Sequence, residues 1–201
     1  MIEIDLNDAS LPLSWQELFG RNAPTDVELG SGKGRFLLEM AGKHPERNFV
    51  GVERAAKYHK LLATRTARRG LGNVRALRTT AEDLLFRLLA PGSVSTFFVL
   101  FPDPWPKKRH HKRRLFTPEI TEAILRALVP GGRLLVKTDH PEYGEVIEAV
   151  FRESPGFKRL PAERIFEDLP LTGFEVKYVQ EGRPISAFAL ERTAPEVVRA
   201  R

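Results

Sequence analysis

Short apolar runs alternate with longer segments whose apolar positions recur every three or four residues, from residue 25 to the end of the chain. The first pattern predicts buried strands and the second predicts amphipathic helices. The expected strands lie at 25–29, 48–53, 73–78, 94–101, 132–138 and 184–190, with a further short strand near 157–161. The expected helices lie at 33–43, 55–69, 81–90, 117–128 and 141–153. This alternation is typical of an α/β fold with a mostly parallel sheet covered by helices.

Local signals mark several boundaries. Thr117-Pro118-Glu119 supplies an N-cap followed by a proline in the first helical turn. Pro130-Gly131-Gly132 is expected to stop that helix and turn the chain into the next strand. Residues 1–24 are expected to form a short arm packed on the rest. Because no repeat or linker interrupts the sequence, a single domain over residues 1–201 is predicted.

The composition narrows the possible functions. Of the 201 residues, 42% are hydrophobic and 29% are charged, as in ordinary folded proteins. The absence of cysteine excludes disulfides, thiolate nucleophiles and cysteine-containing zinc sites. The five histidines lack the spacing of metal ligands, so no metal site is predicted. No apolar stretch approaches a membrane span and the first residues lack a signal-peptide pattern, so a cytoplasmic protein without a membrane partner is expected.

The positive charge is concentrated in one segment, residues 107–114, which begins with Lys107. These eight residues carry six Lys or Arg side chains, and without them the counts would be 26 Lys+Arg against 26 Asp+Glu. The net charge of +6 therefore equals the charge of this segment. Such a dense cluster predicts binding to a polyanion, most simply a phosphate backbone. A solvated loop or a sorting tract is the alternative, but the apolar strand at 94–101 would deliver this loop to a sheet edge.

A glycine-rich turn follows the first expected strand. The sequence Val27 to Phe36 has the spacing GxGxG, with Gly30 and Gly32 as its first two glycines, and lets a ligand approach the backbone closely. A dinucleotide-binding turn would have the spacing GxGxxG. Glu28 stands two residues before the first glycine. A carboxylate there favours an ammonium or sulfonium ligand over a diphosphate.

Acidic residues also follow the next two strands. Glu53 ends the second strand, where its carboxylate can accept hydrogen bonds from the two hydroxyls of a ribose. With the glycine turn, it favours a nucleoside cofactor, and S-adenosylmethionine over NAD. After the third strand, Glu82, Asp83 or a backbone amide could contact an adenine ring. The alternative role for all three acids is stabilisation of a helix N-terminus.

The turn Phe101-Pro102-Asp103-Pro104-Trp105-Pro106 closes the fourth strand. Prolines on both sides stiffen the backbone at Asp103, and Trp105 offers a flat face on which a base could stack. A packing turn is the alternative, but a rigidly held acid beside an aromatic ring favours a site.

These motifs together resemble the tRNA (guanine(46)-N7)-methyltransferase family. The resemblance covers roughly residues 25–191 and is carried by FPDPWPKKRHHKRRL (101–115), VELGSGKG (27–34), VGVE (50–53), PGGRLLVKTDH (130–140) and TGFE (172–175). It implies a Rossmann-like class I methyltransferase fold, with a mostly parallel seven-stranded sheet and helices on both faces. It further implies S-adenosylmethionine as the methyl donor and a guanine in the tRNA variable loop as the acceptor. Whether the protein is a monomer or a homodimer stays open.

The resemblance assigns roles to individual positions. Asp103 would lie at the reaction centre. The implied cofactor-binding residues are Glu28, Gly30, Gly32, Glu53, Thr80, Ala81, Glu82 and Asp103. The implied substrate-binding residues are Lys107, Asp139, Thr172, Gly173, Phe174 and Glu175.

A second interpretation exists for Thr80, for Asp139 and for the 172–175 segment. Thr80 stands where the family usually has an acid, so either Thr80 and the backbone of Ala81 contact the adenine, or Glu82 substitutes through a shifted loop. From the residues alone, the 172–175 segment is a helix cap, and Asp139 is a helix N-cap before Pro141.

The chemistry fits this set of residues. Guanine N7 has a lone pair and no proton to lose, so its methylation needs alignment and no strong general base. Asp103 or Asp139 could stabilise the positive charge that develops on the base while accepting hydrogen bonds from its N1–H and N2–H groups. Two alternatives stay open. One is an exocyclic-amine methyltransferase with Asp103-Pro104-Trp105 as its motif, disfavoured by the missing second proline, and the other is a non-catalytic tRNA-binding module.

Overall fold

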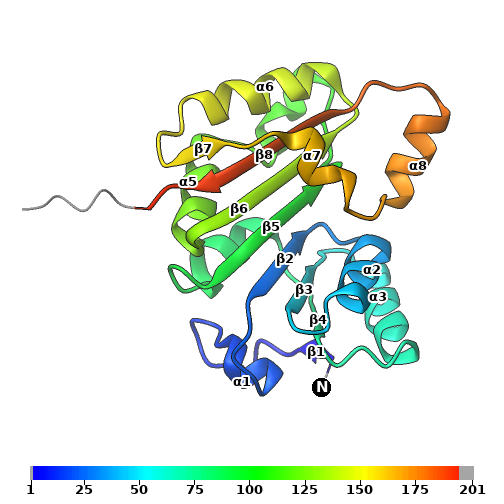
Figure 1. Cartoon of the computed structure of the whole chain (residues 1–201), viewed down its shortest axis with the longest axis vertical. Coiled ribbons are helices and arrows are strands. Elements are labelled where there is room, and N and C mark those ends of the chain that lie inside the picture. Colours follow the sequence, from blue (N-terminus) through cyan, green and yellow to red (C-terminus); the bar gives the residue numbers. More distant parts are fainter. Residues whose placement is uncertain (1, 195–201) are drawn as a thin grey trace, which may run out of the picture.

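The computed structural model describes residues 2–194, and its strands form one eight-stranded sheet in the order β1-β4-β3-β2-β5-β6-β8-β7 (Figure 1). Met1 and residues 195–201, which the single-domain prediction includes, lie outside the described residues. The strands are β1 (Glu3–Ile4), β2 (Thr25–Leu29), β3 (Asn48–Val52), β4 (Val74–Leu77), β5 (Val94–Leu100), β6 (Leu128–Thr138), β7 (Phe157–Arg159) and β8 (Ser186–Arg192).

Helices join most of the strands. They are α1 (Trp15–Phe19), α2 (Arg35–Lys43), α3 (Ala56–Arg68), α4 (Ala81–Asp83), α5 (Pro118–Ala127), α6 (Pro141–Arg152), α7 (Ala162–Glu167) and α8 (Gly173–Gln180). Two further helical segments are the π-helix η1 (Leu84–Leu88) and the 3₁₀-helix η2 (Lys108–Arg113).

The topology is that of the expected Rossmann-like fold. Strands β1 to β6 pair in parallel, and β8 pairs antiparallel with both β6 and β7. The sheet has one strand more than predicted because Glu3 and Ile4 pair with the edge strand β4. The strand order reverses between β2 and β5. Open α/β sheets bind their ligands beside such a reversal, beyond the carboxyl ends of the strands.

Each face of the sheet has its own apolar core, as expected for helices on both faces. Side chains of η1, α5 and α6 pack with Val27, Phe97 and Val136 on one face. Side chains of α2, α3 and α7 pack with Phe98 and Leu135 on the other. Neighbouring residues such as Phe97 and Phe98 face opposite cores because side chains alternate along a strand.

Most predicted boundaries hold to within two residues, and two predictions need correction. The helix expected at 81–90 is a short α-helix followed by a π-helix, in which the Leu89 N–H donates to the Leu84 carbonyl at 3.1 Å. The turn expected at Pro130–Gly132 lies inside β6, because the helix already ends at Ala127. The pairing of β5 with β6 shifts register there, and Gly131 has a φ of 75°. These glycines therefore form an irregularity within a strand.

Residues 2–24, the described part of the expected N-terminal arm, pack on the rest of the domain. Trp15 is 9% exposed, and its indole N–H donates to the Ser93 carbonyl at 2.7 Å. Leu13 is also buried in the core of that face. Among the described residues, no helix is both long enough and apolar enough to cross a membrane.

Candidate functional site

The glycine turn between β2 and α2 is held against the end of β3. The N–H groups of Gly30 and Ser31 both donate to the Val52 carbonyl, at 2.9 and 3.0 Å. Gly30 has a φ of 81°, in the left-handed region that glycine occupies without strain. Apart from its chain neighbours, no described atom lies within 4 Å of the position that a Gly30 Cβ would take. The turn therefore leaves open space beside its backbone, as a ligand requires.

Glu28 lies in β2, two residues before the first glycine of this turn, and its carboxyl group is buried. The residue is 4% exposed, and its Oε2 atom has no hydrogen-bond partner among the described residues. Burial raises the pKa of Glu28 well above its usual value, and the charge of Glu53 raises it further, whereas a hydrogen bond from the Leu37 backbone lowers it. A buried acceptor without a partner costs free energy, and a cationic donor would relieve that cost.

Glu53 connects the glycine turn with the start of α3. Its Oε2 accepts from the Gly32 N–H at 3.0 Å, and its Oε1 accepts from the Ala55 N–H at 2.8 Å. The alternative role as a helix N-cap or first-turn acid is wrong, because Ala55 is the N-cap residue of α3 and Glu53 lies outside the helix. Each carboxylate oxygen can accept a further hydrogen bond, so a ribose could still bind there.

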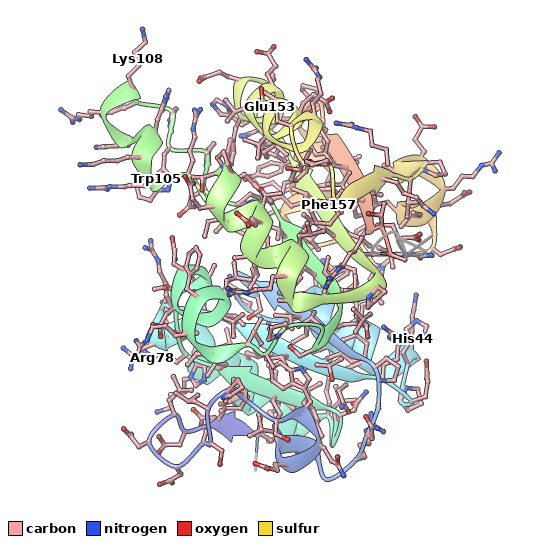
Figure 2. The ribbon with its side chains drawn as sticks, turned by 90° about the vertical axis from the view of Figure 1, so that its left-hand side faces the viewer. His44, Arg78, Trp105, Lys108, Glu153 and Phe157 are labelled. Atoms are coloured by element: carbon pink, nitrogen blue, oxygen red, sulfur yellow. The ribbon has the colours of Figure 1, made fainter. Side chains whose placement is uncertain are left out.

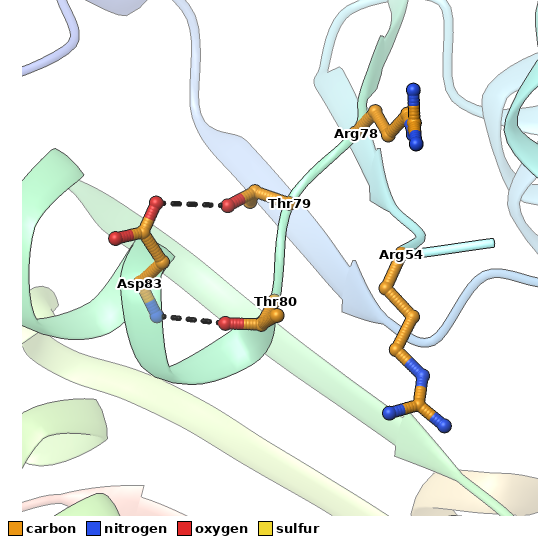
Figure 3. A pocket seen from close by; sticks show the side chains of 5 residues that line it. All are labelled: Arg54, Arg78, Thr79, Thr80 and Asp83. Carbon is orange, nitrogen blue, oxygen red and sulfur yellow. Dashed lines mark hydrogen bonds between the residues drawn. The ribbon is translucent and has the colours of Figure 1, made fainter. Parts of the chain in front are cut away.

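An open hollow of about 520 Å³ lies beyond β3 and β4, lined by Arg54, Arg78, Thr79, Thr80 and Asp83. Figure 3 shows its two hydrogen bonds: Thr79 donates to the Asp83 carboxylate at 3.0 Å, and Thr80 accepts from the Asp83 N–H at 3.1 Å. Thr80 is thus the N-cap of α4, with Ala81 and Glu82 in its first turn. Asp83 is a first-turn acid, as the alternative interpretation predicted.

The Phe101–Pro106 loop leaves the carboxyl end of β5 with a strained backbone. Phe101 has a φ of 59° and Trp105 a φ of 44°, which bulky residues rarely adopt. Such conformations persist only where the surroundings hold them, and they are frequent at functional sites. The Phe101 N–H donates to the Lys137 carbonyl at 2.8 Å, and its ring meets Tyr178 edge to face at 5.4 Å. Asp103, between the two strained residues, is exposed.

The basic run projects from the body of the molecule as η2, and Lys108 extends outward from it (Figure 2). The exposed cations are Lys107, Lys108, Arg109, Lys112 and Arg113. Arg114 is instead buried, with 7% of its surface exposed. Five of the six cations are therefore available to a polyanion, one fewer than the sequence predicted. The Arg113 guanidinium also lies 4.9 Å from the centre of the Trp105 ring, so it covers one face of the proposed stacking platform.

Asp139 follows β6, and its carboxylate is paired with an arginine that lies outside the sequence motifs. Arg183 donates to Asp139 Oδ2 at 2.9 Å, and its guanidinium lies 4.5 Å from the centre of the Tyr178 ring. This hydrogen bond raises the pKa of Arg183. The prediction that Asp139 caps α6 is wrong, because His140 is the N-cap and its Nδ1 accepts from the Tyr143 N–H at 3.3 Å. A guanine edge at Asp139 would therefore share Oδ2 with Arg183 or replace it there.

The segment Thr172 to Glu175 opens α8. The Thr172 hydroxyl accepts from the Glu175 N–H at 2.9 Å, which confirms the helix cap inferred from the residues alone. Phe174 is 58% exposed, so it is accessible to a substrate. Glu175 is instead 5% exposed and forms an ion pair with Lys137 of β6. Its carboxylate therefore anchors α8 to the sheet in this structure.

The arrangement places the candidate residues along the carboxyl edge of the sheet. Glu28, Gly30, Gly32 and Glu53 come together at β2 and β3, Thr80, Ala81 and Glu82 lie beyond β4, and Asp103, Lys107, Asp139 and Thr172–Glu175 lie beyond β5 and β6. Sequence reasoning missed Lys137, Arg183 and Arg114 as partners of this site. Lys137 and Arg114 lie within the sequence motifs, but only the fold reveals that they are buried.

Comparison with known proteins identifies the family of this chain. Residues 22–188 match the family model described as "Putative methyltransferase". The tRNA (guanine-N(7)-)-methyltransferase of Nitrosococcus oceani is 38% identical over 184 residues, which cover 90% of this chain and 77% of the relative. The enzyme of the same name from Leifsonia xyli subsp. xyli is 39% identical over 178 residues, covering 86% and 78% of the two chains.

Solved structures support the fold. The antibiotic-resistance methyltransferase Kmr superposes with a TM-score of 0.61 at 20% sequence identity, over 92% of this chain and 96% of that one. The 16S rRNA methyltransferase KamB superposes with a TM-score of 0.60, also at 20% identity, over 90% and 93% of the two chains. At this identity the solved structures show only a shared fold. The sequence matches show more: the chain belongs to the tRNA (guanine-N7)-methyltransferase family.

Proposed function

We propose that this protein transfers the methyl group of S-adenosylmethionine to N7 of guanine 46 in the variable loop of tRNA. The observation that carries the proposal is the joining of two features on one sheet edge, in a chain of this family. The first is the open glycine turn with the buried carboxyl group of Glu28. The second is the Asp103 loop, which leads directly into five exposed cations.

The residues present fit S-adenosylmethionine. We assign the cofactor's ammonium group to Glu28 Oε2, which has no partner among the described residues, because a cation there would favour the charged carboxylate. Glu53 would accept from the ribose hydroxyls, and the open side of Gly30 gives the cofactor access to the backbone. When bound, the cofactor supplies an electrophilic methyl group on a sulfonium.

The adenine would lie in the hollow beyond β3 and β4. The Thr80 hydroxyl already accepts the Asp83 N–H, but it keeps a proton to donate. Ala81 stands at the first position of α4, where backbone N–H groups lack partners within the helix. We therefore favour Thr80 and the Ala81 backbone as the adenine contacts, with Glu82 as an exposed first-turn acid.

The substrate side would act by positioning and electrostatics. The exposed cations of the basic run would hold the phosphate backbone, with Lys107 nearest to the Asp103 loop in sequence. Asp103 would stabilise the positive charge that guanine gains on N7 methylation. Asp139 would accept from the N1–H and N2–H groups, in competition with Arg183 at Oδ2. Phe174 is exposed enough to contact the base.

The test is methyl transfer to tRNA that lacks the modification. The purified protein is incubated with this tRNA and methyl-labelled S-adenosylmethionine, and the digested nucleosides are separated by mass spectrometry. The proposal predicts labelled 7-methylguanosine. Label in an N-methylated adenosine would instead support an exocyclic-amine methyltransferase. Binding of tRNA without any transfer would support a non-catalytic binding module.

A further inference from the structure

Arg114 differs from the rest of the basic run because its side chain is buried. Its side chain is 5% exposed, whereas the five other cations of the run are exposed. A buried guanidinium is costly unless its N–H groups and its charge are paired. The neighbours of Arg114 therefore indicate what it does.

Three groups surround the Arg114 guanidinium. Its Nε donates to the Pro104 carbonyl at 2.8 Å, and its Nη2 donates to Glu142 Oε1 at 3.1 Å. Its central carbon lies 5.1 Å from the centre of the Tyr143 ring, which is fully buried. Glu142 and Tyr143 belong to the first turn of α6, so Arg114 links the loop after β5 to that helix.

The bonded carbonyl belongs to the strained loop. Pro104 lies between Asp103 and Trp105, and Trp105 has a φ of 44°. A strained backbone needs contacts that hold it, because relaxation would otherwise recover the energy of the strain. The hydrogen bond from Arg114 holds the peptide group that joins Pro104 to Trp105.

We propose that Arg114 is a positioning residue for methyl transfer: its buried guanidinium fixes the Asp103 loop against α6 and does not bind tRNA phosphate. This inference rests on the proposed function, because it takes Asp103 to lie at the reaction centre. Arginine suits the task since its planar fork donates in two directions while its face lies on an aromatic ring. A lysine would keep the charge but lose this geometry.

The test separates positioning from tRNA binding by crossing two substitutions. Arg114→Lys keeps the charge and loses the fork. It is expected to lower kcat by about ten- to a hundred-fold, because small displacements of reacting groups cost rate. The tRNA dissociation constant and its salt dependence are expected to stay at wild-type values. Lys112→Ala removes an exposed charge of the same run, and weaker, less salt-dependent tRNA binding is expected.

A second readout does not depend on catalysis. Trp105 follows the bonded carbonyl, so its fluorescence reports on the loop. The chain has a second tryptophan, Trp15, and a Trp105→Phe variant shows how much of the total fluorescence comes from Trp105. Arg114→Lys is expected to increase acrylamide quenching of Trp105, whereas Lys112→Ala leaves it unchanged. Thermal melting shows whether Arg114→Lys folds. If it does not, Glu142→Gln takes its place, because it removes the charge of one Arg114 partner. A several-fold fall in kcat at unchanged tRNA affinity is expected for Glu142→Gln.

Two results would overturn the inference. One is a folded Arg114→Lys variant with wild-type kcat and wild-type Trp105 quenching. The other is a loss of tRNA affinity and salt dependence with kcat retained, which would make Arg114 a phosphate contact. Failure of the proposed function would look different from these two results. In that case the wild-type protein itself would yield no 7-methylguanosine, although Arg114 is in place.

Discussion

The buried carboxyl group of Glu28 leads to a prediction that separates cofactor binding from folding. Glu28→Gln keeps the size and shape of the side chain and removes its ability to carry a negative charge. Glu28 is 4% exposed and its Oε2 has no partner among the described residues, so the charge has little compensation in the free protein. The substitution is therefore expected to weaken cofactor binding without destabilising the fold.

The magnitude for binding follows from one lost charged hydrogen bond. Hydrogen bonds to charged groups contribute about 1.5–3 kcal/mol, which corresponds to an increase in Kd of roughly ten- to 150-fold. Isothermal titration calorimetry with S-adenosylhomocysteine, which carries the same ammonium group, measures this change. Glu153→Gln is the matched control, because Glu153 is exposed at the end of α6.

The pH dependence of stability gives an independent check. Burial raises the pKa of Glu28 in the folded protein, so the folded state binds this proton more tightly than the unfolded state does. The contribution to stability is then fully present below the unfolded pKa, and it is lost as pH rises through the folded pKa. Glu28→Gln has no such loss, so its free energy of unfolding relative to wild type should increase from about pH 4.5 upward.

Urea denaturation between about pH 5 and 8 measures this difference. A ligand ammonium at Glu28 also favours the carboxylate, so cofactor binding should release protons, detectable as a binding enthalpy that depends on the buffer. Wild-type cofactor affinity in Glu28→Gln would refute the assignment of Glu28 to the ammonium. A stability difference that does not change with pH would refute the reasoning about its pKa.

Three further outcomes are expected. Replacing Lys107, Lys108 and Lys112 by Ala should weaken tRNA binding and reduce the slope of log K against log salt by about 0.7–0.9 for each lost phosphate contact, measured by filter binding; an unchanged slope would remove η2 from the interface. Arg183→Ala frees the Asp139 carboxylate, and since solvent-exposed ion pairs are weak, KM for tRNA should fall by no more than about five-fold in steady-state kinetics; a rise in KM would show that Arg183 itself binds tRNA. Lys137→Met leaves the buried Glu175 carboxylate without its ion-pair partner, so the free energy of unfolding in urea should fall by about 3–5 kcal/mol and be partly restored by adding Glu175→Leu. A fall below about 1 kcal/mol would contradict the anchoring of α8.

The central strands and their helices could be predicted from the sequence because their patterns are local. The apolar run Val94 to Leu100 and the cap at Thr117 each specify their element within a few residues. The missed elements are short or lack a pattern of their own. The two residues of β1 form a strand only because β4 offers them an edge, and α8 has one buried residue, Glu175.

The candidate site was predictable where motifs carry it and unpredictable where partners come from distant segments. The glycine turn with Glu28 and Glu53 follows from spacing and strand order. The pairing of Asp139 with Arg183 joins residues 44 positions apart, and the pairing of Lys137 with Glu175 joins residues 38 apart. The burial of Arg114 within a run of exposed cations depends on the position of α6, which no local pattern specifies.

The most direct test of the central claim is to map the methylated position in tRNA. Borohydride reduces 7-methylguanine, and aniline then cleaves the RNA strand at that nucleotide. Unmodified tRNA treated with this protein and S-adenosylmethionine should be cleaved at guanine 46. Neither a tRNA with adenine in place of that guanine nor the Asp103→Ala variant should give the cleaved product. Cleavage at another guanine, or equal cleavage with Asp103→Ala, would contradict the account.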